Sequence, residues 1–142
     1  MTANPRDVYD RLTKKHMLSP IIACAILGNI QQESNFKTTT EGFDGTGSAG
    51  LCQWLGTRLA YLKKCALNYK TDWRDWETQV DFIKAELLTT EILAWRKLRI
   101  ARTVEEATLA FSKYYERPSS KYAHNDKRVA YAKSFYSEFA SE

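Results

Sequence analysis

The 142-residue sequence holds little glycine, proline, cysteine or histidine, and each shortage narrows the classes of protein that it can be. Six glycines and three prolines provide few of the turn signals that a chain of many short strands requires. The three cysteines cannot all pair and none has the spacing of a zinc site, so we expect reduced thiols packed as small hydrophobic side chains. The two histidines, His16 and His124, lie far apart without a ligand motif, and we expect neither a metal nor another cofactor.

Long hydrophobic runs are also absent. The longest apolar stretch covers residues 21–27, far short of the roughly 20 residues that a membrane span requires, so no membrane partner is expected. The N-terminal segment includes acids and lacks an apolar centre, which argues against a signal peptide. Neither sign of charge dominates, because 21 Lys and Arg stand against 17 Asp and Glu for a net charge of +4. The basic residues form no block that would indicate nucleic-acid binding, and their slight excess suits an acidic polymer such as a cell wall.

What is present fits one globular domain. The sequence is 44% hydrophobic and 27% charged, and no repeat or flexible linker divides residues 1–142. Apolar residues recur at helical spacing along nearly the whole chain. We therefore predict a compact all-α domain of six or seven helices, with at most a small hairpin in the glycine-rich segment 37–50.

Polar and proline residues predict several helix boundaries. Ser19-Pro20 combines a capping side chain with a proline in the first turn, and the most apolar helix of the chain follows it. A later helix is expected to stop before Pro118. Asn125 or Asp126 is expected to cap the last helix.

Glu33 occupies an unusual place at the end of the apolar helix. On a helical wheel it falls within an arc of about 80° that also holds Ile22, Ile26 and Ile30, so it continues the face turned toward the core. A carboxyl among apolar neighbours is held in its neutral form, and such a group can give a proton to a leaving oxygen. If the helix ends one turn earlier, Glu33 is instead an ordinary surface carboxylate.

The segment after this helix carries groups suited to a sugar ligand. Its glycines allow the backbone to approach a ligand closely. Ser48 and Gln53 offer neutral donors and acceptors for sugar hydroxyls and N-acetyl groups. Trp54 and Phe36 are large enough to stack on a sugar face, although both residue types are more often part of a core. The helix end, the loop and the next helix together predict the wall, lip and floor of a binding cleft.

These residues resemble the phage tail lysozyme family, whose members are peptidoglycan-degrading domains with a lysozyme-like fold. The resemblance rests on A-I-L-G-N-I-Q-Q-E-S-N-F at residues 25–36 and G-S-A-G-L-C-Q-W at 47–54. The later F-S-K-Y-Y-E-R-P at 111–118 is similar to the family's F-x-x-x-Y-E-R-P element. The pairing of E-S-x-F with G-L-x-Q is shared with soluble lytic transglycosylases. The resemblance therefore implies a lysozyme-like glycan-cleaving domain.

The resemblance also implies roles for individual residues. It makes Glu33 the catalytic acid and Ser34 a residue that orients the site. Further residues are implied to form the cleft, with the last two on its opposite side: Ser48, Gln53, Trp54, Tyr115 and Glu116. Two structural alternatives stay open. Tyr115 can simply pack against Phe111 one helical turn away, and Glu116 can form a helix-end ion pair with Arg117.

Glycoside hydrolysis normally uses two carboxyls. Asp44 is the preferred second acid and Glu41 the other choice, unless the substrate's own N-acetyl or 6-hydroxyl group serves. The first hypothesis is a muramidase that cleaves the β-1,4 bond between N-acetylmuramic acid and N-acetylglucosamine. A lytic transglycosylase acting on the same bond and an inactive glycan-binding or virion structural module are the alternatives. A cysteine endopeptidase is disfavoured, because Cys24 lies in the apolar helix, where a thiolate is unstable.

Partners and location follow from the same resemblance. We expect peptidoglycan glycan strands as the substrate, with other phage tail or lysis proteins as further partners, and no nucleic acid. The expected location is the phage tail, or the host cytoplasm before release to the cell wall.

Overall fold

The computed structural model describes residues 1–39 and 47–140 of the chain. This part holds seven α-helices and no β-strand, which confirms the predicted all-α class. Isolated backbone bridges join Thr2 to Lys37 and Ala49 to Trp54. In order, the α-helices, π-helical turns (η1, η2, η4) and 3₁₀ turn (η3) are α1 (Pro5–Asp10), η1 (Arg11–Lys15), α2 (Pro20–Ser34), α3 (Thr57–Asn68), α4 (Trp76–Leu87), α5 (Ile92–Ile100), α6 (Val104–Ala110), η2 (Phe111–Glu116), η3 (Ser120–Tyr122), α7 (Asn125–Phe135) and η4 (Tyr136–Ala140).

The first residues of α2 and α7 can be compared with the helix starts predicted from the sequence. The Ser19 hydroxyl accepts a hydrogen bond from the Ile22 backbone N–H at 3.2 Å, so α2 begins as the sequence predicts. Helix α7 begins at Asn125, and its N-cap is His124 rather than Asn125 or Asp126. His124 turns the chain with a left-handed backbone (φ 44°, ψ 49°), while the Asn125 side chain accepts a hydrogen bond from the Ser112 hydroxyl at 2.8 Å.

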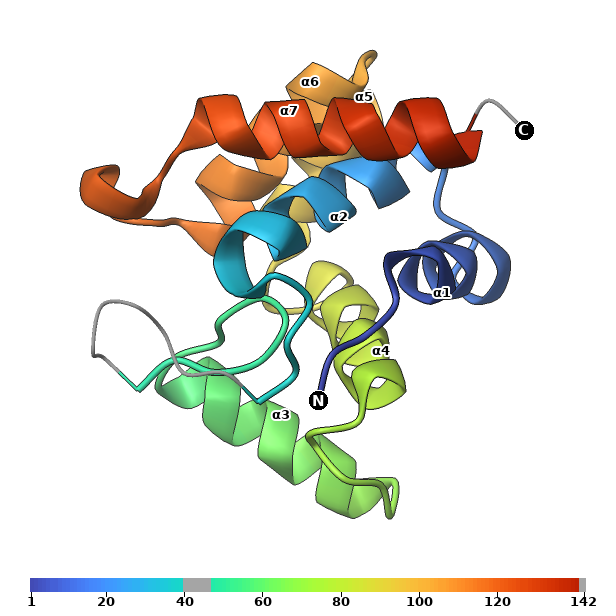
Figure 1. Cartoon of the computed structure of the whole chain (residues 1–142). Helices are drawn as coiled ribbons and strands as arrows, with labels where there is room; N and C mark the ends of the chain where they lie inside the picture. The colour runs from blue at the N-terminus through green and yellow to red at the C-terminus, as the bar shows by residue number, and fades with distance from the viewer. Residues whose placement is uncertain (40–46, 141–142) are drawn as a thin grey trace.

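Helix α2 is the central element of the fold, and ten of its fifteen residues are buried. Helix α7 lies along one side of it and α4 lies on the other side (Figure 1). Gly28 allows the close approach of α7, because a Cβ at this position would stand 2.6 Å from the Arg128 carbonyl oxygen and 2.7 Å from the Ala132 Cβ. This contact brings Arg128, near the start of α7, against the second half of α2.

None of the described helices is long and apolar enough to cross a membrane. All three cysteines are free, with Cys24 and Cys52 buried and Cys65 partly exposed. Burial raises the pKa of Cys24 to about 12 and that of Cys52 well above its usual range. A nucleophilic thiolate is therefore unstable at both buried positions.

Candidate active site

A cleft of about 650 Å³ opens at the C-terminal end of α2. This volume is in the range of sites that hold small organic ligands. Three stretches of chain meet around it: the last turn of α2, the segment before α3, and the connection from η2 to α7. The lining residues are Gln32, Glu33, Ser48, Cys52, Gln53, Leu55, Arg58, Glu116, Arg117, Pro118, Ser119, Tyr122 and His124.

Glu33 lies in the last turn of α2, with 17% of its side chain exposed. The helix runs through Ser34 and ends at Asn35, whose left-handed backbone (φ 53°) closes it. Helix α2 therefore does not stop a turn early, and Glu33 lies in the cleft wall. The sequence places the acid correctly on the inward side of the helix.

The surroundings of Glu33 are more polar than the helical wheel predicts. Arg128 Nη1 lies 3.0 Å from Glu33 Oε2, and the Arg128 side chain is only 1% exposed. The same guanidinium donates hydrogen bonds to Asn29 Oδ1 at 3.0 Å and to the Ala123 carbonyl at 2.6 Å. A fixed guanidinium orients the carboxylate and favours its charged form. No sequence pattern marks Arg128, because it reaches Glu33 only through the packing of α7 on α2.

Burial favours the neutral form of a second carboxyl, Glu116. It ends η2 and lines the same cleft, and its Oε2 atom is enclosed with no hydrogen-bond partner in the described part of the chain. Burial raises the pKa of Glu116 well above its usual range; the Glu33 charge adds to this shift, and Arg128 and Arg58 oppose it. Two acids with opposed environments thus meet at one cleft, which is the arrangement that acid–base catalysis uses.

Two predicted residues in the segment before α3 also line the cleft. The Ser48 hydroxyl donates to Gln53 Oε1 at 3.1 Å, and Gln53 Nε2 donates to the Gly50 carbonyl at 3.0 Å. Gln53 holds a left-handed backbone (φ 53°). Both residues line the cleft with neutral hydroxyl and amide groups, which suit hydroxyl and amide ligands.

Ser34 and Gln79 fix this segment from behind. The Ser34 hydroxyl donates to the Leu51 carbonyl at 2.8 Å and is buried, so Ser34 positions the segment rather than lining the cleft. The fully buried Gln79 accepts from the Leu51 N–H at 2.9 Å and donates to the Thr38 carbonyl at 2.8 Å. The sequence analysis missed Gln79, because a polar residue within an amphipathic helix carries no signal of burial.

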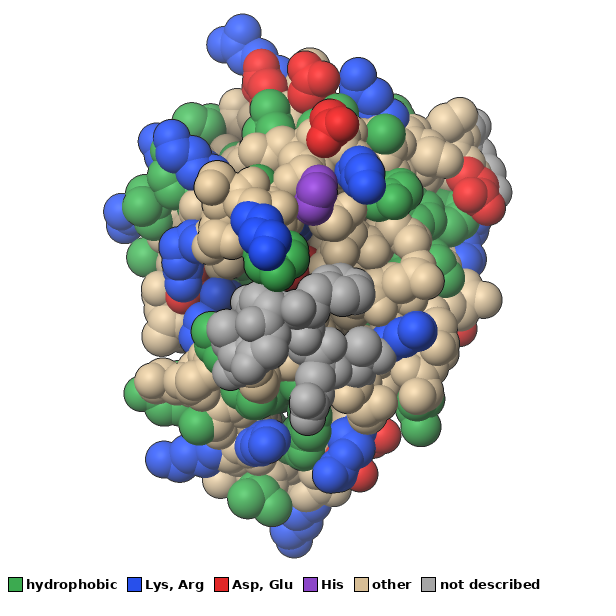
Figure 2. Space-filling view, turned by 60° about the vertical axis from the view of Figure 1, so that its left-hand side comes forward, with side chains coloured by type: hydrophobic (Ala, Val, Ile, Leu, Met, Phe, Trp, Pro, Cys, Tyr) green, Lys and Arg blue, Asp and Glu red, His purple; other side chains and the backbone are tan. Residues whose placement is uncertain are grey.

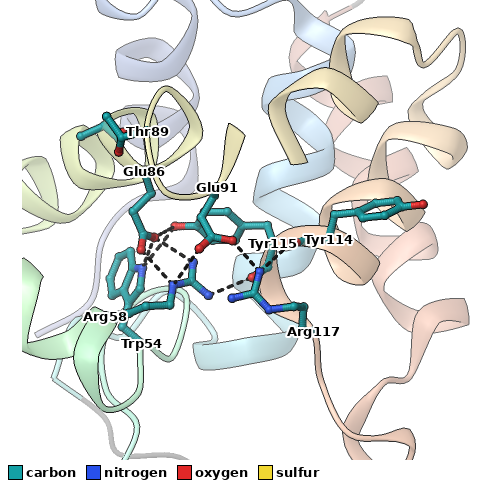
Figure 3. Close-up of polar contacts among 9 residues, drawn as sticks. Trp54, Arg58, Glu86, Thr89, Glu91, Tyr114, Tyr115 and Arg117 are labelled. Atoms are coloured by element: carbon teal, nitrogen blue, oxygen red, sulfur yellow. Dashed lines mark hydrogen bonds and ion pairs between the residues drawn. The ribbon is translucent and has the colours of Figure 1, made fainter. Parts of the chain in front are cut away.

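Trp54 and Tyr115 lie behind the cleft wall, in the core. Trp54 is 1% exposed and Tyr115 is fully buried, so neither borders the cleft as predicted. The reason is the buried carboxylate of Glu86, which accepts from Trp54 Nε1 at 2.9 Å and from the Tyr115 hydroxyl at 2.6 Å (Figure 3). Tyr115 also stacks on Phe111, with ring centroids 4.2 Å apart, as the structural alternative proposes. Phe36 is 2% exposed and belongs to the core.

Arginine side chains connect this core to the cleft. Arg58 donates to Glu86 through Nε and Nη2, both at 2.8 Å, and to the Tyr115 carbonyl at 2.9 Å. Arg117 pairs with Glu91 rather than with Glu116, so the predicted helix-end ion pair is absent among the described residues (Figure 3). The network joins α3, α4 and η2, and thereby holds two cationic side chains of the cleft in place.

The described part of the chain offers no metal site. No three His, Cys, Asp or Glu side chains within it are placed to hold an ion. Lys and Arg side chains are scattered over the face drawn in Figure 2 and form no continuous block. Asp44 and Glu41, the two choices for the second acid, lie outside the described residues.

A helical domain with two carboxyls at one open cleft has the groups that a glycoside-cleaving domain requires. The family model for phage tail lysozymes matches residues 3–139, nearly the whole chain. The chain belongs to the phage tail lysozyme family. Membership confirms the resemblance found in the sequence; it implies peptidoglycan degradation and suggests a place in the phage tail. A comparison with curated proteins gives no match.

Proposed function

We propose that the protein is a muramidase that cleaves the β-1,4 bond between N-acetylmuramic acid and N-acetylglucosamine, with Glu33 as the general acid. The observation that carries this proposal is the position of Glu33, which is partly exposed in the cleft wall and bonded to a buried arginine. An acid so held has a defined direction toward a ligand in the cleft, and positioned proton transfer contributes roughly 10²–10⁴ to a rate.

The proton that is transferred to the glycosidic oxygen is proposed to come from Glu33 and Glu116, the two carboxyls of the cleft. Glu116 and Glu33 interact electrostatically, so protons bind to them as a coupled system. Burial and the charge of Glu33 raise the pKa of Glu116, so Glu116 keeps its proton to a higher pH than a free carboxyl does, while Arg128 orients Glu33 from 3.0 Å away. Glu33 reaches the cleft, whereas Oε2 of Glu116 is enclosed. In the proposal, Glu116 stores a proton and passes it to the Glu33 carboxylate, and Glu33 then delivers it to the glycosidic oxygen.

The second group stays a prediction from the sequence. Asp44 is proposed to activate water or to stabilise the positive charge that develops on the sugar ring. If the 6-hydroxyl of the muramoyl sugar takes this role instead, the enzyme is a lytic transglycosylase. The two reactions differ in their products, because hydrolysis leaves a reducing end and transglycosylation leaves a 1,6-anhydromuramoyl end.

The test combines one variant with one product analysis. Purified protein is incubated with peptidoglycan, and the released fragments are identified by mass spectrometry. We expect reducing ends from the wild type and a loss of roughly 10²-fold or more in Glu33→Gln. Glu105→Gln is the matched control, since Glu105 is an exposed glutamate, 55% exposed, whose nearest cation is Lys133 at 3.5 Å.

Each outcome decides one part of the proposal. Anhydromuramoyl ends assign the transglycosylase reaction, and full activity in Glu33→Gln overturns the assignment of the acid. A wild-type protein that is folded, binds peptidoglycan and releases no fragments is the inactive glycan-binding module.

A further inference from the structure

We propose that Arg117 and His124 form a carboxylate-binding subsite at the rim of the cleft, which selects glycan strands carrying muramoyl or stem-peptide carboxylates over uncharged glycan. This inference rests on the proposed function, because it names the part of the substrate that the cleft recognises beside the sugar ring. The rim segment is defined here as residues 117–124, the connection from η2 to α7.

The rim segment forms one side of the cleft and carries positive charge only. Its sequence is R-P-S-S-K-Y-A-H, which contains two Lys or Arg, one His and no acid. Five of its eight residues line the cleft, including Arg117 and His124 at its two ends. A ligand in the cleft therefore meets cationic or neutral groups along this whole side.

Arg117 is held in place but keeps donors for a ligand. Its side chain is 50% exposed, and only Nη1 is engaged, with Glu91 and with the Tyr114 carbonyl at 2.7 Å. Nη2 and Nε have no hydrogen-bond partner among the residues that the structure describes. Pairing with the buried Glu91 reduces the freedom of the guanidinium, so a ligand does not have to immobilise it. A planar guanidinium with two adjacent free donors is the group best suited to bind a carboxylate.

Arg117 and His124, at the two ends of the rim segment, both have an unfavourable backbone conformation for residues with a side chain. A functional role of these two side chains would explain why glycine does not occupy these positions. Arg117 has φ 49° and His124 has φ 44°, a left-handed conformation that glycine adopts without steric penalty. Residues with a side chain adopt it only against steric repulsion between their Cβ atom and the backbone. Gln53, across the cleft, shares this feature with φ 53°. Of the seven non-glycine residues with positive φ in residues 1–39 and 47–140, three thus line one cleft.

Within the described residues, the other charged groups of the cleft have strong interactions of their own. Glu33 is bonded to Arg128, and burial favours the neutral form of Glu116. Arg58 is engaged by Glu86. Among the described cations of the cleft, Arg117 and His124 are therefore the groups best placed to bind an anion. In peptidoglycan, carboxylates occur on the lactyl group of muramic acid once its peptide is removed, and on the stem peptide when it is present.

The experiment measures kcat/KM on three substrates. These are intact peptidoglycan, the same glycan stripped of peptides by an amidase so that only lactyl carboxylates remain, and intact peptidoglycan with its carboxylates converted to amides. Arg117→Gln is expected to lose about tenfold on carboxylate-bearing substrate, mainly through KM, and less than twofold on the amidated one. Arg117→Lys, which keeps the charge, is expected to recover part of the loss. Arg99→Gln is the control, because Arg99 is an exposed cation that does not line the cleft.

The substrate that shows the loss identifies the carboxylate. A loss on the stripped glycan assigns the lactyl group, and a loss confined to intact peptidoglycan assigns the stem peptide. An equal loss on the amidated substrate, or none on any substrate, overturns the subsite. If the wild type cleaves nothing, the proposed function fails, and the subsite is then judged by co-sedimentation: wild type must bind native peptidoglycan better than amidated peptidoglycan, and Arg117→Gln must not distinguish them.

Discussion

Arg128 and Glu33 meet at 3.0 Å, although one lies in α7 and the other at the end of α2. The arginine is fixed by Asn29 and by the Ala123 carbonyl as well, so it supports the acid independently of any ligand. The geometry of the cleft acid consequently depends on how closely α7 packs on α2. We therefore expect changes at this contact to affect both stability and the proposed activity.

Replacing Arg128 separates its charge from its geometry. Arg128→Met leaves Asn29 Oδ1 without its arginine donor, and we expect a loss of roughly 2–4 kcal/mol in the free energy of unfolding. Arg128→Lys keeps a cation but cannot reach all of these partners, so we expect a smaller loss of stability and at least a tenfold loss of activity. Urea unfolding and turbidity assays measure both effects. Full activity in Arg128→Met would contradict the proposed support of Glu33.

Gly28→Ala tests the helix contact without touching the cleft. In an exposed helix this change stabilises by about 1 kcal/mol, but here the new Cβ would meet the Arg128 carbonyl oxygen at 2.6 Å. We expect a loss of about 1–3 kcal/mol, together with lower activity because α7 shifts and carries Arg128 away from Glu33. A second-site change of Ala132 to glycine, which removes the Cβ at 2.7 Å, should recover part of both losses. A stabilised Gly28→Ala protein would show that the two helices are not in close contact.

Glu116 gives a pH dependence of stability whose sign follows from its raised pKa. In the unfolded chain the carboxyl ionises near pH 4.5, whereas the folded protein retains the proton to higher pH. Between the pKa of Glu116 in the unfolded chain and its higher pKa in the folded protein, the unfolded state has lost a proton that the folded state still binds. The contribution of Glu116 to the free energy of unfolding therefore falls as pH rises. Glu116→Gln removes the effect. The variant should match the wild type near pH 4 and exceed its unfolding free energy by roughly 1–3 kcal/mol at pH 8.

The pH series also has a catalytic readout. Because Glu116 is proposed to store the proton, Glu116→Gln should narrow the pH–rate profile on its alkaline side. Glu105→Gln, at an exposed position, should leave both the profile and the pH dependence of unfolding unchanged. A stability difference between wild type and Glu116→Gln that does not vary with pH would contradict the buried neutral carboxyl.

Trp54→Phe distinguishes a core role from a sugar-stacking role. The substitution keeps an aromatic ring but removes the N–H that Glu86 accepts at 2.9 Å, so we expect a loss of about 1–2 kcal/mol in stability. KM for peptidoglycan should change less than twofold, because the ring does not line the cleft. Gln53→Ala, at a residue that does line it, should raise KM. A larger rise in KM for Trp54→Phe than for Gln53→Ala would place the indole at the substrate.

Thiol titration tests the burial of the cysteines. Only the partly exposed Cys65 should react quickly with an aromatic disulfide reagent in the native protein, because Cys24 and Cys52 are buried and have raised pKa values. All three thiols should react after denaturation, and Cys65→Ser should abolish the fast phase. Rapid reaction of two or more thiols in the native state would contradict the burial of Cys24 or Cys52.

The sequence predicts the helices well because the signals involved are local. Apolar spacing and the Ser19 cap determine α2 from a few neighbouring residues, and the position of Glu33 follows from the same pattern. The start of α7 is missed because the left-handed turn at His124 leaves Asn125 free to bind Ser112 in a distant segment. A residue that resembles a cap in the sequence can thus serve a tertiary contact instead.

The candidate site is only partly predictable for the same reason. Ser48 and Gln53 line the cleft as predicted, since they lie on the segment that directly follows the acid-bearing helix. Trp54 does not line the cleft, because its indole N–H donates to Glu86, a residue of another helix, and this bond holds the ring in the core. Arg128 has no local signal at all. The catalytic roles of Glu33 and Asp44 stay predictions until the variants are measured.

The bond between Asn29 and Arg128 joins positions 99 residues apart in the chain. A ribosome must therefore synthesise α7 before the support of Glu33 is complete. A nascent chain that has produced only α2 and the segment after it lacks the arginine that braces Glu33. The cleft therefore reaches its final geometry only when synthesis of the chain is nearly finished.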